Sequence, residues 1–158
     1  MSESPHRIVA LELDRRSVVR WSAQVEHERS VAIFDLLENN YFKVVETTEG
    51  PYRVVLTLRD SNVVFSVACD GAPEPIEITL STRPFRRVVK DYFMICDNYF
   101  QAIKGATPSR IEAIDMARRG LHNEGSEILR NALEGKVEID HDTARRLFTL
   151  VCVLHIRG

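Results

Sequence analysis

A chain of 158 residues with 44% apolar and 28% charged side chains has the composition of an ordinary folded domain, which excludes a disordered or fibrous protein. Its 21 basic and 23 acidic residues give a formal net charge of −2, so no strong overall field attracts the protein to DNA or to anionic lipid. We expect one domain that spans residues 1–158, because a chain of this length buries enough surface for a single core.

The cysteines and the apolar segments bear on the cellular compartment. Cys69, Cys96 and Cys152 are far apart, lack C-x-x-C spacing and lie among apolar neighbours, which argues against a disulfide-stabilised secreted protein. The first residues show no signal-peptide pattern, and the longest apolar run, residues 147–156, is too short to cross a bilayer. The sequence therefore predicts a cytoplasmic protein without a membrane partner.

The first half of the chain is predicted to contain strands and one helix. Alternating residues predict an opening strand over residues 7–14, with Val9, Leu11 and Leu13 on one face. An apolar stripe at helical spacing predicts a helix over residues 22–39, on which the segment from Glu26 to Arg29 forms an exposed surface. Four further strand-like runs, separated by turn signals, occupy residues 41–47, 52–59, 63–69 and 76–80. Their short connections favour antiparallel neighbours.

From Pro84 onward the apolar period becomes helical. Apolar and aromatic residues recur at three and four positions over residues 86–103 and predict a helix there, with the aromatic side chains in the core. Ser109 and Glu112 have the spacing of a capping box, so a second helix is expected to begin there. It is expected to stop near Gly120.

Two more helical segments follow. Asn123 is positioned to cap a short helix that Gly135 ends, and Asp140 or Asp142 to cap a last one. Many β-branched residues in residues 147–156 leave helix and buried strand open for that segment.

The order of these elements predicts the fold class. Strands and helices in segregated runs favour an α+β fold over a parallel doubly wound sheet. We expect an antiparallel meander with one helix in residues 1–83, and a helical half in residues 84–158 that packs on one face of the sheet.

Several enzyme signatures are absent from the sequence. It contains no Gly-rich phosphate loop, no H-E-x-x-H and no G-x-S-x-G, and its five histidines are scattered. We therefore expect no cofactor and no metal site. A helix-turn-helix is also disfavoured, because Gly120 follows Ala117 one position too early and the next helix offers only Arg130, so nucleic-acid binding is not expected.

Four arginine doublets are candidate anion-binding elements, because the guanidinium fork binds carboxylate or phosphate groups with two hydrogen bonds. They occupy positions 15–16, 86–87, 118–119 and 145–146. If they converge, they would form a site; if they are scattered or pair with nearby acids, they are solvated surface. The candidate ligand-binding residues are Arg86, Arg87, Arg118, Arg119, Asn123, Arg145 and Arg146.

A polar cluster around His122 is a candidate catalytic site. His122 would act as an acid or base, with Asp115 or Glu124 to orient it. The structural alternative is that the same residues cap the ends of two helices at a junction between Gly120 and Gly125.

Several longer runs resemble one bacterial family. They include PFRRVVKDY at residues 84–92, IEAIDMARRG at residues 111–120, and residues 25–29, 32–38, 50–53, 122–125 and 142–150. Together they resemble a family of short alphaproteobacterial proteins grouped as an uncharacterised protein family. The resemblance implies a stand-alone cytosolic domain and transfers neither an activity nor catalytic residues.

Three functions remain open at this point. The leading hypothesis is a non-enzymatic binding or regulatory domain that recognises an anionic small molecule or an acidic protein surface through its arginines. The first alternative is a small enzyme, a hydrolase or transferase, that uses His122. The second is a homo-oligomeric interaction protein that associates through the helix at residues 22–39 or through a strand edge.

Overall fold

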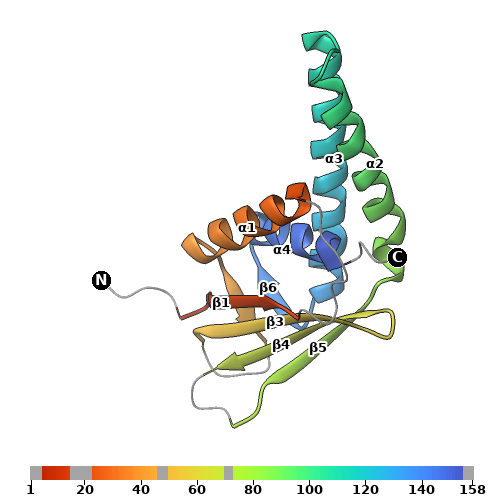
Figure 1. Cartoon of the computed structure of the whole chain (residues 1–158). Coiled ribbons are helices and arrows are strands. Elements are labelled where there is room, and N and C mark those ends of the chain that lie inside the picture. Colours follow the sequence, from red (N-terminus) through yellow and green to blue (C-terminus); the bar gives the residue numbers. More distant parts are fainter. Residues whose placement is uncertain (1–4, 15–22, 46–49, 70–72, 155–158) are drawn as a thin grey trace.

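The computed structural model describes residues 5–14, 23–45, 50–69 and 73–154. Its elements in chain order are β1 (Ile8–Leu13), α1 (Ala23–Glu38), β2 (Phe42–Val44), β3 (Tyr52–Arg59), β4 (Asn62–Cys69), β5 (Ile76–Ser81), a short 3₁₀ helix (Arg83–Phe85), α2 (Arg86–Ala102), α3 (Pro108–Leu133), β6 (Val137–Ile139) and α4 (His141–Leu154) (Figure 1). The predicted α+β class is confirmed.

The main sheet has the strand order β1-β3-β4-β5. The predicted meander is confirmed for β3, β4 and β5, which pair antiparallel. The β3–β4 hairpin turns at Asp60 and Ser61, whose φ angles of 52° and 65° lie in the left-handed region. By contrast, β1 pairs parallel with β3, because α1 separates the two strands and allows a crossover.

The strand β1 presents a different face from the one predicted. Its register shifts between Ile8 and Ala10, so Ile8 and Leu11 are buried whereas Val9 is 41% exposed. The prediction that Val9, Leu11 and Leu13 share one face of the strand was therefore wrong. One irregular position in a strand moves the side chains that follow it to the other face of the sheet.

A second, two-stranded sheet forms from β2 and β6, which pair antiparallel. The strand β2 therefore leaves the predicted meander. The sequence did not predict β6, because three residues are too few for a periodic signal. Gly135, with a φ of 82°, ends α3 and allows the chain to turn directly into β6.

The helix α3 is continuous over 26 residues, so the predicted break near Gly120 was wrong. Its N-cap is Thr107, whose hydroxyl accepts a hydrogen bond from the backbone N–H of Arg110. The predicted capping box at Ser109 was also wrong. Pro108 explains the earlier start, because proline at the first helical position needs no hydrogen-bond partner for an N–H.

Of the segment 147–156, which the sequence left open between helix and strand, residues 147–154 are helical and belong to α4; residues 155 and 156 lie outside the described residues. Asp140 caps α4, and its Oδ1 accepts from the backbone N–H of Thr143 at 2.9 Å. Between Leu147 and Leu154 every side chain except Thr149 is buried. A helix that is apolar on all sides is typical of the middle of a core, which explains its strand-like composition.

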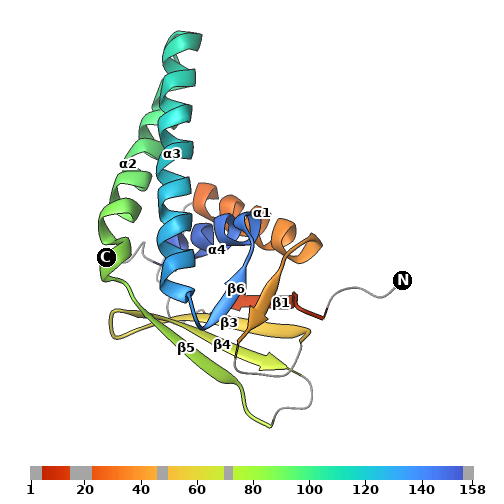
Figure 2. The same ribbon diagram turned by 180° about the vertical axis from the view of Figure 1, so that it is seen from behind.

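Figures 1 and 2 show how the layers are arranged. The helices α1 and α4 cover one face of the main sheet, and the α2–α3 hairpin rises from the same side and extends beyond them. The helix α4 contacts both α1 and α3. In the part of the chain that the structure describes, none of the helices has the length and apolar character needed to cross a membrane.

Candidate functional site

A pocket of about 420 Å³ lies among α1, α3 and α4. Its size is within the range of ligand-binding pockets. The lining residues are His27, Glu28, Val31, Ala32 and Asp35 from α1, Tyr92 from α2, Arg118, Arg119 and His122 from α3, and Asp142, Arg145, Arg146 and Thr149 from α4.

Helical spacing explains why these side chains meet. The lining residues of α1, α3 and α4 follow one another at three, four and seven positions, which places them on one face of each helix. Because α4 packs against both α1 and α3, the three faces enclose one space.

Arg145 is the most unusual residue of the pocket. Its Nε is buried, and it has no hydrogen-bond partner among the residues that the structure describes. Leaving a buried donor unsatisfied costs about 1–3 kcal/mol, and more when the group is charged. The guanidinium therefore lies at the pocket with unused hydrogen-bonding capacity.

The other pocket arginines are anchored by neighbouring groups. Arg118 and Arg119 both form ion pairs with Asp115, at 2.6 Å and 3.1 Å, and the hydrogen bond from Arg118 lowers the pKa of Asp115. Arg118 also lies over the ring of Tyr99, 4.9 Å from its centroid. Arg146 donates from Nη1 to the backbone carbonyl of Asn39 at 3.0 Å.

His122 lies in the interior part of the pocket. Its Nε2 is 2.8 Å from the hydroxyl oxygen of Thr149, and its ring packs edge-on against Phe148 and Tyr92. Its Nδ1 is buried without a hydrogen-bond partner among the described residues. Burial, with the charges of Arg145 and Arg118, lowers the pKa of His122 to about 4, so the imidazole is neutral at neutral pH.

Three carboxylates also line the pocket, on Glu28, Asp35 and Asp142. None of them forms an ion pair with any residue in the described ranges. Burial raises the pKa of Glu28, although the charges of Arg118 and His27 oppose this effect. The pocket therefore contains separate positive and negative groups.

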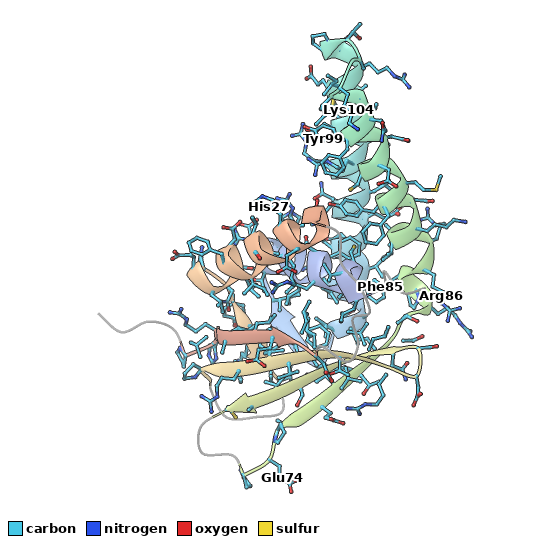
Figure 3. All side chains as sticks on the ribbon, viewed as in Figure 1. His27, Glu74, Phe85, Arg86, Tyr99 and Lys104 are labelled. Atoms are coloured by element: carbon cyan, nitrogen blue, oxygen red, sulfur yellow. The ribbon has the colours of Figure 1, made fainter. Side chains whose placement is uncertain are left out.

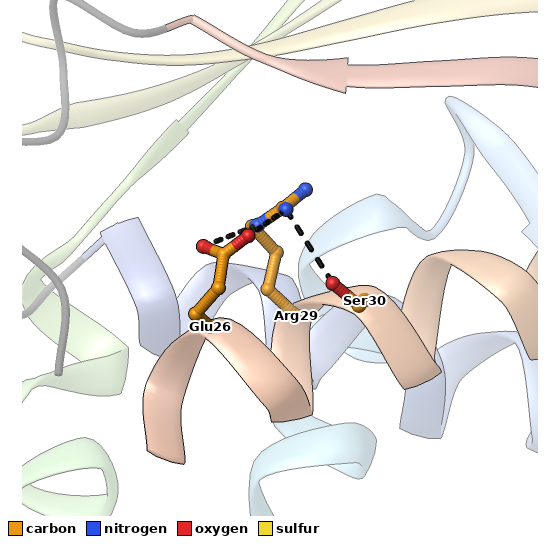
Figure 4. Close-up of polar contacts among 3 residues, drawn as sticks. All are labelled: Glu26, Arg29 and Ser30. Carbon is orange, nitrogen blue, oxygen red and sulfur yellow. Dashed lines mark hydrogen bonds and ion pairs between the residues drawn. The ribbon is translucent and has the colours of Figure 1, made fainter. Parts of the chain in front are cut away.

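An arginine outside the pocket shows a different arrangement. Arg29 on α1 forms an ion pair with Glu26 and donates to the hydroxyl of Ser30 at 3.5 Å (Figure 4). An arginine with an acid one helical turn away normally pairs in this manner. Arg145 has an acid three positions earlier, Asp142, and does not pair with it.

The predicted arginine doublets separate into two groups. The doublets at positions 118–119 and 145–146 converge on the pocket. Arg86 and Arg87 lie at the exposed start of α2, where Arg87 pairs with Asp91 at 3.1 Å and with Glu124 at 2.9 Å. Figure 3 shows Arg86 pointing outward at the sheet end of α2, whereas His27 lies at the end of α1 near α3. The doublet at positions 15–16 lies outside the described residues.

The structure does not bring His122 together with its proposed carboxylate partners. Because α3 is continuous, His122 lies within the helix and not at a junction. Asp115 is engaged by two arginines, and Glu124 pairs with Arg87 on another surface. Asn123 is exposed and does not line the pocket.

Sequence reasoning missed the acidic side of the site. It assigned the segment around His27 and Glu28 to an exposed surface, whereas Glu28 is only partly exposed and lines the pocket. The available signal was the spacing of Glu28, Val31 and Asp35, which places two acids on one helical face. Thr149 and Tyr92 carried no separate signal, because both lie in apolar stretches.

Comparisons with known proteins confirm the resemblance seen in the sequence. The chain is 58% identical to the UPF0262 protein of Brucella anthropi over 153 residues, which cover 96% of this chain and 95% of that one. It is 56% identical over 152 residues to a UPF0262 protein of Rhodospirillum rubrum, covering 96% and 93%, and 60% identical over 142 residues to one of Rhizobium meliloti, covering 90% of each. No solved structure matches the chain. The model of an uncharacterised protein family, UPF0262, matches residues 5–157, and the chain therefore belongs to this alphaproteobacterial family, whose function is unassigned.

Proposed function

We propose that the pocket binds a small molecule through an anionic group, a carboxylate or a phosphate, and that the protein acts as a binding or regulatory protein. The observation that carries the proposal is the buried Nε of Arg145, which has no hydrogen-bond partner among the described residues. An anionic group in the pocket that pairs with the guanidinium of Arg145 would supply the counter-charge that no described acid provides.

The surroundings of Arg145 support an anionic ligand. Arg118, Arg119 and Arg146 line the same pocket, and their contacts with Asp115 and with the Asn39 carbonyl hold them in place. Guanidinium groups held in position lose less conformational entropy when they bind a ligand. A concave space bordered by three helices favours a small molecule over an acidic protein surface.

His122 supports binding more than acid–base catalysis. Its hydrogen-bond partner is Thr149 and not a carboxylate, so no acid among the described residues orients the ring. A pKa near 4 makes the neutral imidazole a weak base at neutral pH. As a neutral ring next to Arg145, it serves as a hydrogen-bonding wall of the binding site.

Isothermal titration tests the proposal with inorganic phosphate, citrate, glutamate and adenosine monophosphate as probes. We expect at least one to bind, and Arg145→Met to weaken that binding by about ten- to a hundredfold, the loss expected for one charge-assisted hydrogen bond. The matched control is Arg87→Met, which removes an arginine outside the pocket and should bind as the wild type does. Circular dichroism confirms that each variant is folded, and Arg146→Met provides a second pocket variant.

Two results would contradict the proposal. One is that none of the anionic probes gives a measurable heat of binding in the titration. The other is equal affinity of the wild type and of folded Arg145→Met and Arg146→Met.

A further inference from the structure

We infer that the ligand of this pocket is a zwitterion, a small molecule of amino-acid type that carries an ammonium group as well as its carboxylate or phosphate. The inference rests on the proposed function and names the ligand class of the same site. It comes from the three pocket carboxylates, which a simple anion site would not contain.

The charged groups of the pocket stay apart although they share one space. Glu28, Asp35 and Asp142 form no ion pair with the residues that the structure describes, and neither does Arg145. Surface side chains of opposite charge that can reach each other usually pair, as Arg29 and Glu26 do on α1. Among the described residues, the pocket therefore presents two arginines without an acid partner, Arg145 and Arg146, and three unpaired carboxylates to a ligand.

Most of the charges also lie on different walls. The helix α1 contributes Glu28 and Asp35, whereas α3 and α4 contribute all four pocket arginines, and the third carboxylate, Asp142, lies on α4. A ligand whose anionic group contacts Arg145 would present its other end to α1. An ammonium group at that end is attracted by the two acids, whereas a second anionic group is repelled.

The charge balance of the pocket excludes a polyanion as the preferred ligand. Four arginines face three carboxylates, and His122 is neutral. Burial raises the pKa of Glu28 although the charges of Arg118 and His27 lower it, and a bound ammonium group would add a further counter-charge to this carboxylate. Val31 and Ala32 lie between the two acids of α1 and provide an apolar contact for the carbon skeleton of the ligand.

The test compares zwitterions with molecules that carry only one of their two charges. Each L-amino acid is titrated beside its N-acetyl derivative, which keeps the carboxylate, and its amide, which keeps the ammonium group. O-phosphoethanolamine is titrated beside inorganic phosphate and ethanolamine, so that carboxylate and phosphate sources are distinguished. We expect one zwitterion to bind at least about tenfold tighter than either of its single-charge counterparts, the effect of one additional charge-assisted contact.

Isosteric variants locate the ammonium group. Glu28→Gln and Asp35→Asn should weaken binding of the zwitterion by about tenfold and should not weaken binding of the N-acetyl anion, because only the zwitterion has a positive charge for these acids to bind. Glu124→Gln is the matched control, since this acid lies outside the pocket.

The outcomes separate this inference from the proposed function. If the N-acetyl anions or phosphate bind as tightly as the zwitterions, or if neither acid variant changes zwitterion binding, the inference is wrong and the proposed function stands. If neither the zwitterions nor the anions bind, both are wrong.

Discussion

Two stretches of α3 lie in opposite environments although they belong to one helix. From Pro108 to Gly120 no residue is buried, and this part extends with α2 beyond the rest of the protein (Figure 1). From residue 121 to Leu133 the helix packs on α4 and buries Gly125, Ser126, Leu129 and Leu133. Arg118 and His122 line the pocket where the exposed stretch meets the buried one. One helix therefore combines an exposed stretch with a packed one, and the pocket lies at the boundary between them.

A glycine in each stretch makes the contrast measurable. A Cβ added at Gly120 would meet no atom within 4 Å, whereas a Cβ at Gly125 would lie 2.1 Å from the ring of Phe148. The same substitution is therefore expected to have opposite effects at positions five residues apart.

The largest expected effect on stability comes from His122, which lies at the boundary between the two stretches, and it appears when the pH is lowered. The unfolded histidine takes up a proton near pH 6.5 and the folded one only near pH 4, so acid favours the unfolded state. Between these values the free energy of unfolding should fall by on the order of 3 kcal/mol, whereas above pH 6.5 His122 contributes no pH dependence. Urea denaturation at pH 7 and pH 4.5 measures this loss.

His122→Gln isolates the contribution, because glutamine does not titrate but can hydrogen-bond to Thr149. Glu28 acts in the opposite direction, since its raised pKa in the folded state favours folding in acid, and it is unchanged in both proteins. If wild type and His122→Gln lose the same stability on acidification, His122 is not buried as described.

Gly125→Ala is expected to destabilise the protein by about 1–3 kcal/mol, because overpacking a filled core displaces neighbouring groups. Phe148 is fully buried and has little room to move. Urea denaturation gives the change in the free energy of unfolding. Phe148→Leu supplies the control: if the clash is the cause, the double variant should be more stable than the sum of the two single losses predicts.

Gly120→Ala is expected to stabilise the protein by about 0.5–1 kcal/mol, because alanine is the better residue in an exposed helix interior. Thermal and urea denaturation of both variants should show that the free energy of unfolding rises in Gly120→Ala and falls in Gly125→Ala. A loss of stability would indicate that α3 is interrupted at Gly120, as the sequence pattern predicts.

The wrong prediction of a break in α3 near Gly120 has a physical cause. Gly120, Asn123 and Gly125 are residues that often end or begin helices, and local rules therefore predict a junction. A glycine inside a helix costs only about 1 kcal/mol, which packing against α2 and α4 outweighs. Gly125 has a further tertiary role, since its lack of a side chain makes room for Phe148.

The candidate site was predictable in part. Adjacent arginines suggested an anion site, and two of the doublets, at positions 118–119 and 145–146, line one pocket, while the binding of an anion there stays a prediction. The sequence could not separate them from Arg86 and Arg87, because all three doublets lie on amphipathic helices. The acids of α1 were missed, since their role depends on which helix lies opposite them.

The sequence by itself determined the α+β class, the strands β3 to β5 and the helices α1 and α2, because each follows from the period of nearby side chains, and it narrowed the cap of α4 to Asp140 or Asp142. Only the tertiary structure decided the parallel pairing of β1 with β3, the pairing of β2 with β6, the continuity of α3 and the membership of the pocket. These features join segments that are far apart in the chain, and local periodicity shows which face of an element is apolar but not which element will cover it.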